Sequence, residues 1–244
     1  MLYVICGFVF GCLIPFFARR VGKSMPATMG YILLKMFIPY HYMPWSKLRT
    51  NQKYMELFKR YIMRSIGWGI FTAAVTYLFA TLFTKFTFAG SVRDIYFHIA
   101  FLWILLLLVE IDKRFMLLPD VFTVPLLILG FFYAAFQGQW IVTSAPEFLN
   151  YAQHSAMGAV FGYAMPVIAS MFIVWKYPDA FGGGDIKLLA ALGAWVGPEI
   201  ITYILLGSCV IFAVTCLINH SRVGPFGPAI IYAALLIITF FFAG

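Results

Sequence analysis

The sequence has little charge and no long polar segment. Only 11% of its 244 residues are charged, and 63% are hydrophobic. A chain of this composition is suited to lipid, and no stretch is long and polar enough to form a separate soluble domain. The sequence therefore predicts an all-α, polytopic integral membrane protein, with a single membrane domain over residues 1–244.

Cysteine is also scarce, and none of it is arranged for metal binding. The four cysteines all lie within apolar runs, and no Cys-x-x-Cys pair occurs: they are Cys6, Cys12, Cys209 and Cys216. Such residues are typical of helix packing rather than of a zinc site or a disulfide framework. We therefore expect no metal ligand among them.

Acidic residues are the rarer charged type, with 9 Asp and Glu against 17 Lys and Arg and a net charge of +8. A basic chain can bind nucleic acid, but here the distribution of Lys and Arg follows the positive-inside rule of membrane proteins. We expect membrane lipid as a partner and no nucleic acid. Residues 18–64 mix basic and aromatic side chains, which predicts a cytoplasmic segment on the membrane surface between the first two spans.

The apolar runs predict about eight transmembrane helices. They are residues 1–17, 65–83, 95–111, 120–136, 151–175, a short 186–196, 200–218 and 229–243. Of the 17 Lys and Arg, only Lys85 and Arg93 fall in loops on the side of the termini. Both termini are therefore expected on the non-cytoplasmic side. Four aspartates then lie near the cytoplasmic face: Asp112, Asp120, Asp179 and Asp185.

Three consecutive glycines, Gly182, Gly183 and Gly184, lead directly into Asp185. Glycine gives backbone freedom and lets another chain approach closely, which suits a peptide substrate. The helix that follows ends at Gly197-Pro198 and is only roughly 16 Å long at about 1.5 Å per residue, shorter than a bilayer core of about 30 Å. Asp185 should then lie below the membrane surface, where ionisable groups are usually functional. The structural alternative is that Asp185 caps its helix.

Asp112 ends the third predicted span, where the negative end of the helix dipole disfavours a carboxylate. With Asp185 on the same face, two carboxylates can share a proton, as in aspartic proteases. The dipoles favour Asp185 as the base and Asp112 as the holder of the proton. The alternative for such a pair is a proton-coupled transport site. Asp120 follows Pro119 and is expected to cap the fourth helix.

Three stretches resemble the type IV prepilin peptidases. Residues 110–120, Glu-Ile-Asp-Lys-Arg-Phe-Met-Leu-Leu-Pro-Asp, are similar to the family's Asp-x-x-x-x-x-Leu-Pro-Asp segment. Residues 182–188, Gly-Gly-Gly-Asp-Ile-Lys-Leu, resemble its Gly-x-Gly-Asp-x-Lys-Leu block. Residues 225–228, Pro-Phe-Gly-Pro, match its segment before the last helix. The resemblance covers residues 95–244, the expected peptidase core.

The resemblance implies an aspartic endopeptidase of the bacterial inner membrane that serves type IV pili or type II secretion. Its catalytic residues would be Asp112 and Asp185, and its substrate a prepilin or pseudopilin. The enzyme would remove the short basic leader after a Gly, at the cytoplasmic membrane face. Other residues of the matching segments would bind substrate or shape the site: Gly182, Gly183, Gly184, Lys187, Asp120, Pro225, Phe226, Gly227 and Pro228.

The N-terminal third departs from the family pattern. Family members commonly carry two Cys-x-x-Cys pairs between the first two spans, and no cysteine occurs between Cys12 and Cys209. This leaves open whether the chain also methylates the new pilin terminus with S-adenosylmethionine, while the peptidase reaction needs no cofactor. Presenilin-type proteases also use Gly-x-Gly-Asp, but their Tyr-Asp and Pro-Ala-Leu motifs do not accompany these aspartates. A transporter should show broken helices in both halves, and the glycine-rich break occurs once.

Overall fold

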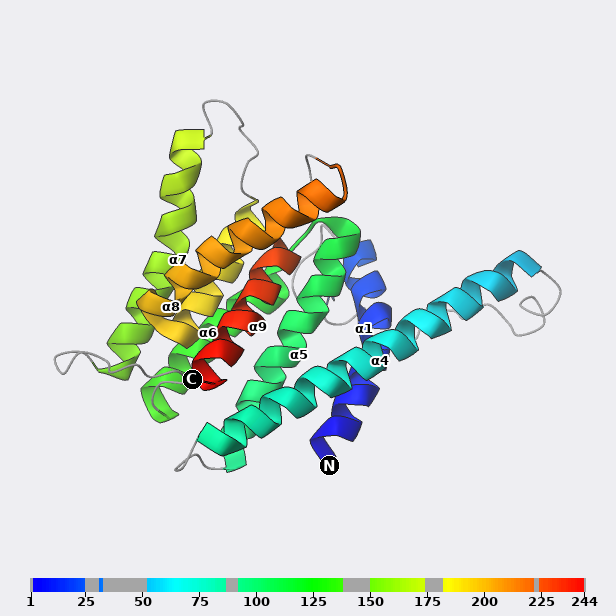
Figure 1. Cartoon of the computed structure of the whole chain (residues 1–244), viewed down its shortest axis with the longest axis horizontal. Coiled ribbons are helices and arrows are strands. Elements are labelled where there is room, and N and C mark those ends of the chain that lie inside the picture. The colour runs from blue at the N-terminus through cyan, green and yellow to red at the C-terminus, as the bar shows by residue number, and fades with distance from the viewer. Residues whose placement is uncertain are drawn as a thin grey trace. The chain divides into compact units, whose positions relative to one another are not determined.

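The computed structural model describes residues 2–24, 31–32, 52–86, 92–137, 150–173, 182–221 and 224–243. Within these ranges the chain forms seven helices and no strand (Figure 1). The helices are α1 (Leu2–Ser24), α4 (Gln52–Phe86), α5 (Val92–Phe115), α6 (Asp120–Gln137), α7 (Tyr151–Ile173), α8 (Gly183–Ile218) and α9 (Gly227–Ala243). The chain divides into two compact units, residues 1–81 and 82–244. The prediction of an all-α protein is confirmed.

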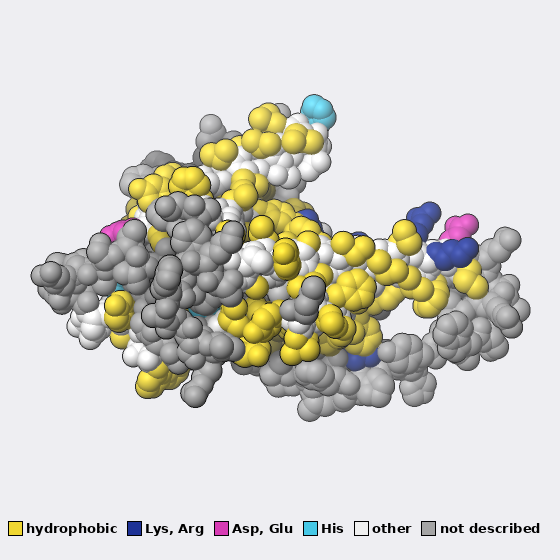
Figure 2. Space-filling view, turned by 60° about the horizontal axis from the view of Figure 1, so that its bottom comes forward, with side chains coloured by type: hydrophobic (Ala, Val, Ile, Leu, Met, Phe, Trp, Pro, Cys, Tyr) yellow, Lys and Arg dark blue, Asp and Glu magenta, His cyan; other side chains and the backbone are white. Residues whose placement is uncertain are grey.

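Among the described residues, four helical segments are long and apolar enough to cross a membrane: Leu2–Val21, Met55–Leu82, Ile95–Phe115 and Gly183–Ile218. Residues 120–136 and 227–240 form shorter apolar helices. Figure 2 shows hydrophobic side chains over much of the described surface, and the exposed ones include Phe136, Leu217 and Phe240. A surface with so many exposed large apolar side chains is suited to lipid. The coarse prediction of a helical membrane protein is therefore confirmed.

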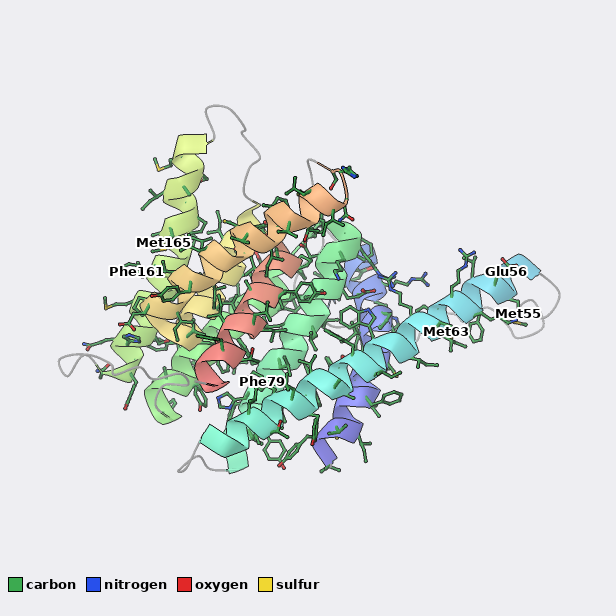
Figure 3. The ribbon with its side chains drawn as sticks, viewed as in Figure 1. Met55, Glu56, Met63, Phe79, Phe161 and Met165 are labelled. Carbon is green, nitrogen blue, oxygen red and sulfur yellow. The ribbon has the colours of Figure 1, made fainter. Side chains whose placement is uncertain are left out.

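The helix α4 begins well before the predicted second span. It starts at Gln52 instead of Ser65, so that the last part of the predicted surface segment is helical. Figure 3 shows Met55, Glu56 and Met63 on this part of α4. Residues 52–64 contain neither Gly nor Pro. Their charges do not interrupt a helical backbone, and the helix therefore continues through them. Residues 25–30 and 33–51 of the predicted surface segment lie outside the described part of the chain.

The first unit is held together by close contact between α1 and α4. Gly7 and Gly11 lie one turn apart on α1 and face α4. A Cβ atom on Gly11 would lie 2.6 Å from the Trp68 carbonyl oxygen and 2.8 Å from Cα of Gly69. A Cβ on Gly7 would lie 2.9 Å from Oγ1 of Thr76. Small residues spaced in this way let two helices pack backbone against backbone, as in membrane helix pairs.

The helix α8 is bent at Gly197, which has φ 82° and ψ 174°. This residue is the only described glycine with a positive φ, a conformation that costs glycine little. Pro198 follows and cannot donate a backbone hydrogen bond into the preceding turn. The predicted end of the sixth helix at Gly197-Pro198 is confirmed. Figure 1 shows the two parts of α8, yellow and orange, leaving this bend in different directions.

The bend brings the two ends of α8 to the same end of the second unit. Gly184, near the start of α8, and Gly227, at the start of α9, both contact the side chain of Leu118. A straight α8 of 36 residues would be about 54 Å long at about 1.5 Å per residue. The connection from Ile218 to Gly227 can span at most roughly 32 Å when fully extended. A straight helix could not satisfy both contacts.

The first part of α8 packs closely against α7. A Cβ atom on Gly158 would collide with the carbonyl oxygen of Gly193, and one on Gly162 with that of Leu189. Gly158 and Gly162 are four residues apart, the small-residue spacing that allows membrane helices to approach. The hydroxyl of Ser155 on the same face donates to the carbonyl oxygen of Ala194 across 2.6 Å.

The first part of α8 also packs against α6, and the two run in the same direction. The indole Nε1 of Trp195 donates to the carbonyl oxygen of Leu126 across 2.8 Å. Nearer the start of both helices, Lys187 of α8 contacts Asp120 of α6. The starts of α6 and α8 therefore lie side by side, next to the connection that leaves α5.

Candidate active site

Asp112 lies in the last turn of α5, because that helix continues to Phe115 rather than ending at residue 111. Met116 ends the helix with φ 49°. Its N–H donates to the carbonyl oxygen of Asp112 across 2.9 Å, the bond that closes a helix with a left-handed final residue. The side chain of Asp112 is buried.

The carboxylate of Asp112 is bound by the start of α9. The backbone N–H of Gly227 donates to Oδ2 of Asp112 across 3.0 Å. A Cβ atom at position 227 would lie 2.7 Å from the same oxygen, so only glycine fits there without displacing it. The first turn of a helix carries partial positive charge. Asp112 thus lies both at the C-terminus of α5 and against the N-terminus of α9, and helix dipoles no longer single it out as the holder of the proton.

Asp185 occupies the third position of α8, and Gly182 is the N-cap residue. The N–H of Asp185 donates to the carbonyl oxygen of Gly182 across 3.0 Å. Its carboxylate accepts a hydrogen bond from the backbone of Gly182. This is the reach-back half of a capping box. The alternative that Asp185 caps its helix is therefore supported in part: Asp185 caps α8 from the third helical position, and the N-cap residue itself is Gly182.

The second unit brings the two aspartates together. Leu118 contacts both Gly184, the residue before Asp185, and Gly227, whose N–H binds Asp112. The two carboxylates, although they come from different helices, therefore lie in the same part of the second unit. Two carboxylates within reach of each other do not both ionise readily, which is the physical requirement for sharing a proton. The arrangement can therefore support acid–base chemistry on a substrate that reaches both groups.

The three glycines before Asp185 differ in their surroundings. A Cβ atom on Gly184 would lie 2.8 Å from Cβ of Leu118 and 3.2 Å from its carbonyl oxygen. A Cβ on Gly183 would meet nothing within 4 Å, and one on Gly182 would meet only the Asp185 carboxylate. None of the three has a positive φ. The expected backbone freedom is therefore not what they supply, and Gly184 instead permits close approach of the protein's own chain.

Lys187 and Asp120 form an ion pair beside the aspartates. The Nζ of Lys187 donates to Oδ1 and Oδ2 of Asp120 across 2.8 and 2.7 Å. Asp120 is the first residue of α6, as predicted, and acidic residues are favoured in a first helical turn. The partner of Lys187 is thus Asp120, an interaction that the sequence did not indicate. The pair joins the start of α6 to the start of α8.

The charged neighbours of Asp112 in the chain bind other groups. Glu110 is fully buried and pairs with Arg114 one turn later, across 2.6 Å. Lys113 donates to the hydroxyl of Tyr232 on α9 across 2.8 Å. These contacts fix the last turn of α5 on both sides of Asp112.

The remaining predicted site residues lie in the turn before α9 and in the first turn of that helix. The ring of Phe226 packs edge to face on that of Phe212, with centroids 5.2 Å apart. Its carbonyl oxygen accepts the N–H of Ile230 across 3.1 Å. Pro225 precedes it and Pro228 is buried at the start of α9. Asp179 lies outside the described residues.

The sequence did not indicate a role for Leu118. This residue contacts Gly184, which precedes Asp185, and Gly227, which binds Asp112, and therefore lies between the surroundings of the two aspartates. The available signal was its position in the Leu-Pro-Asp segment. The structure thus defines a helical membrane protein with a pair of aspartates, one in the last turn of α5 and the other in the first turn of α8.

Residues 99–217 match the type IV leader peptidase family. The match includes both Asp112 and Asp185 and covers just under half of the chain. The segment 225–228 lies beyond the match.

Several curated relatives are named prepilin leader peptidase/N-methyltransferase. The one from Dichelobacter nodosus is 33% identical over 148 residues, which cover 57% of this chain and 47% of the relative. The one from Aeromonas salmonicida (strain A449) is 36% identical over 136 residues, covering 52% and 43%. The one from Vibrio cholerae is 31% identical over 143 residues, covering 55% and 52%. The chain thus spans about half the length of these relatives. No solved structure matches it.

Proposed function

We propose that the chain is an aspartic endopeptidase that removes the short basic leader of type IV prepilins or pseudopilins at the cytoplasmic membrane face. The observation that carries this proposal is the pairing of Asp112 with Asp185 within the part of the chain that matches the leader peptidase family. The relatives named prepilin leader peptidase support the substrate class. They do not support the alternative of a proton-coupled transporter.

In the proposed reaction the two aspartates act on one water molecule and one peptide bond. The ionised carboxylate takes a proton from water, and the water oxygen attacks the carbonyl carbon of the Gly that ends the leader. The protonated carboxyl donates its proton toward the carbonyl oxygen. The C–N bond then breaks, and the amine of the mature pilin leaves with a proton from the pair. The N–H of Gly227 holds the Asp112 carboxylate in one orientation while this happens.

We further propose that the chain crosses the bacterial inner membrane about eight times, with both termini on the non-cytoplasmic side. The bend at Gly197 supports two separate membrane segments within α8. The helices α6 and α9 contain 18 and 17 residues. At about 1.5 Å per residue they are roughly 26 Å long, close to the thickness of a bilayer core. In this arrangement both aspartates lie near the cytoplasmic face.

N-methylation is a separate question, because the relatives are also named as methyltransferases. S-adenosylmethionine has a cationic sulfonium and ribose hydroxyls, which acidic side chains commonly bind. In the described part of the chain the acidic groups next to the aspartates are paired, Asp120 with Lys187 and Glu110 with Arg114. Both of these carboxylates are already held by basic partners, and the proposal concerns leader removal alone.

The test is to incubate the purified chain in detergent with a purified prepilin and measure the intact mass of the pilin. A product shortened at the Gly of the leader supports the proposal. Asp112→Asn protein, purified in the same way, should leave the prepilin intact. A prepilin that is unchanged by the wild-type chain, tested with several prepilins and pseudopilins, would contradict it. Addition of S-adenosylmethionine shows in the same spectrum whether a methyl group is added.

A further inference from the structure

Leu118 lies in the connection between α5 and α6, between the residues that hold Asp112 and those that hold Asp185. Its side chain is only 8% exposed, whereas the preceding residues Met116 and Leu117 are 57% and 46% exposed. The connection therefore turns a single leucine inward. The left-handed Met116 ends α5 and lets the chain change direction just before Leu118.

On one side Leu118 limits the approach of α8. Its Cβ lies 2.8 Å from where a Cβ of Gly184 would be, and its carbonyl oxygen lies 3.2 Å from the same point. Contacts this short leave no space between the two backbones. The position of Gly184, and with it the position of the next residue Asp185, is thus set by the backbone and Cβ of Leu118.

On the other side Leu118 limits the approach of α9. Its Cδ1 lies 3.2 Å from where a Cβ of Gly227 would be. Gly227 is the residue whose N–H binds Oδ2 of Asp112. The end of the Leu118 side chain thus contacts Gly227, which orients Asp112. The Cβ of Leu118 contacts Gly184, which precedes Asp185.

We propose that Leu118 is a positioning residue that sets the separation between the Asp112 and Asp185 carboxylates. This inference rests on the proposed function, because the separation matters through the shared proton and the bound water. Leu118 does not take part in the chemistry. It acts through Gly227 on Asp112 and through Gly184 on Asp185, and removal of its side-chain end lets α9 move relative to α8.

The kinetic test compares Leu118→Ala and Leu118→Met with Leu126→Ala. Leu126 is a fully buried leucine in the interior of α6, so its truncation controls for a general loss of core packing. Leu118→Ala should lower kcat per folded molecule by about 10- to 100-fold with little change in KM, because small misplacements of catalytic groups are costly. Leu118→Met, which conserves volume, should recover most of kcat. Equal kcat losses in Leu118→Ala and Leu126→Ala would overturn the proposal.

A second test needs no prepilin and is independent of the proposed activity. The four native cysteines, which form no disulfide in the structure, are first changed to serine. Asp112→Cys and Asp185→Cys are then introduced together into this variant. Bis-methanethiosulfonate reagents of increasing spacer length then report the separation of the two thiols. Leu118→Ala should change the spacer that cross-links best, and Leu126→Ala should not. An unchanged preference in Leu118→Ala overturns the proposal, whereas wild-type protein that cleaves no prepilin overturns only the proposed function.

Discussion

Gly227 donates its backbone N–H to Oδ2 of Asp112 across 3.0 Å, and so joins residues 115 positions apart in the chain. The contact gives the Pro-Phe-Gly-Pro segment a physical role, since it directs the start of α9 at the first aspartate. Hydrogen bonds to a charged acceptor are stronger than those between neutral groups. The orientation of Asp112 therefore depends on a turn that lies outside the family match.

Gly227→Ala should lower cleavage activity, because the added Cβ would lie 2.7 Å from the oxygen that the glycine N–H binds. A lost hydrogen bond to a charged group costs about 1.5–3 kcal/mol, which corresponds to a rate loss of about 10- to 100-fold. The measurement is kcat/KM on a prepilin. Gly207→Ala is the matched control in α8, where the nearest atom is the flexible end of Ile237 at 3.2 Å. Equal rates for the two variants would contradict the role of Gly227.

Gly183→Ala and Gly184→Ala should differ in stability although they are neighbours. A Cβ on Gly184 meets Leu118, whereas one on Gly183 meets nothing within 4 Å. Alanine is favoured over glycine within a helix by about 0.5–1 kcal/mol. Gly183→Ala should therefore keep or raise the free energy of unfolding, and Gly184→Ala should lower it. Unfolding in a denaturing detergent, followed by circular dichroism, measures both. A stable Gly184→Ala protein would remove the argument for close packing on Leu118.

The ion pair between Lys187 and Asp120 should affect activity more than stability. Both side chains are about half exposed, and such pairs contribute about 0–1 kcal/mol. Asp120→Asn and Lys187→Gln should each lower kcat, but less than Asp112→Asn, because they loosen the start of α8 against α6. The exchange of both charges, Asp120→Lys with Lys187→Asp, should restore part of the rate. Recovery is partial because a lysine at a helix start is disfavoured.

A charge exchange that restores nothing would place Asp120 or Lys187 in direct contact with substrate instead. The kinetic measurement is the same in each case, kcat and KM on one prepilin. An increase in KM with an unchanged kcat in Lys187→Gln would likewise contradict a positioning role.

Local sequence chemistry was sufficient for much of the fold. The Gly197-Pro198 break was predicted from residue types alone, because one residue supplies a positive φ and the next removes a donor. The start of α6 at Asp120 followed in the same way from Pro119. The early start of α4 at Gln52 does not follow from the sequence pattern, because its charged residues are also typical of a surface segment, although nothing in residues 52–64 ends a helix.

The sequence predicted which residues form the candidate site, but only part of how those residues contact one another. Asp112 and Asp185 came from their unusual positions and from the family resemblance. The contact of Gly227 with Asp112 depends on how α8 bends and returns, which no local pattern specifies. For the same reason Gly184 was expected to face a substrate, whereas it faces Leu118.

The most direct test of the aspartate pair compares leader cleavage by the wild type, Asp112→Asn, Asp185→Asn and the double variant at equal amounts of folded protein. Asn keeps the shape of the side chain and removes the titrating acid. Because the two groups act as one unit, each single change should reduce the rate as far as the double change does. A single variant that retains the wild-type rate, or two losses that multiply in the double variant, would contradict a shared catalytic role.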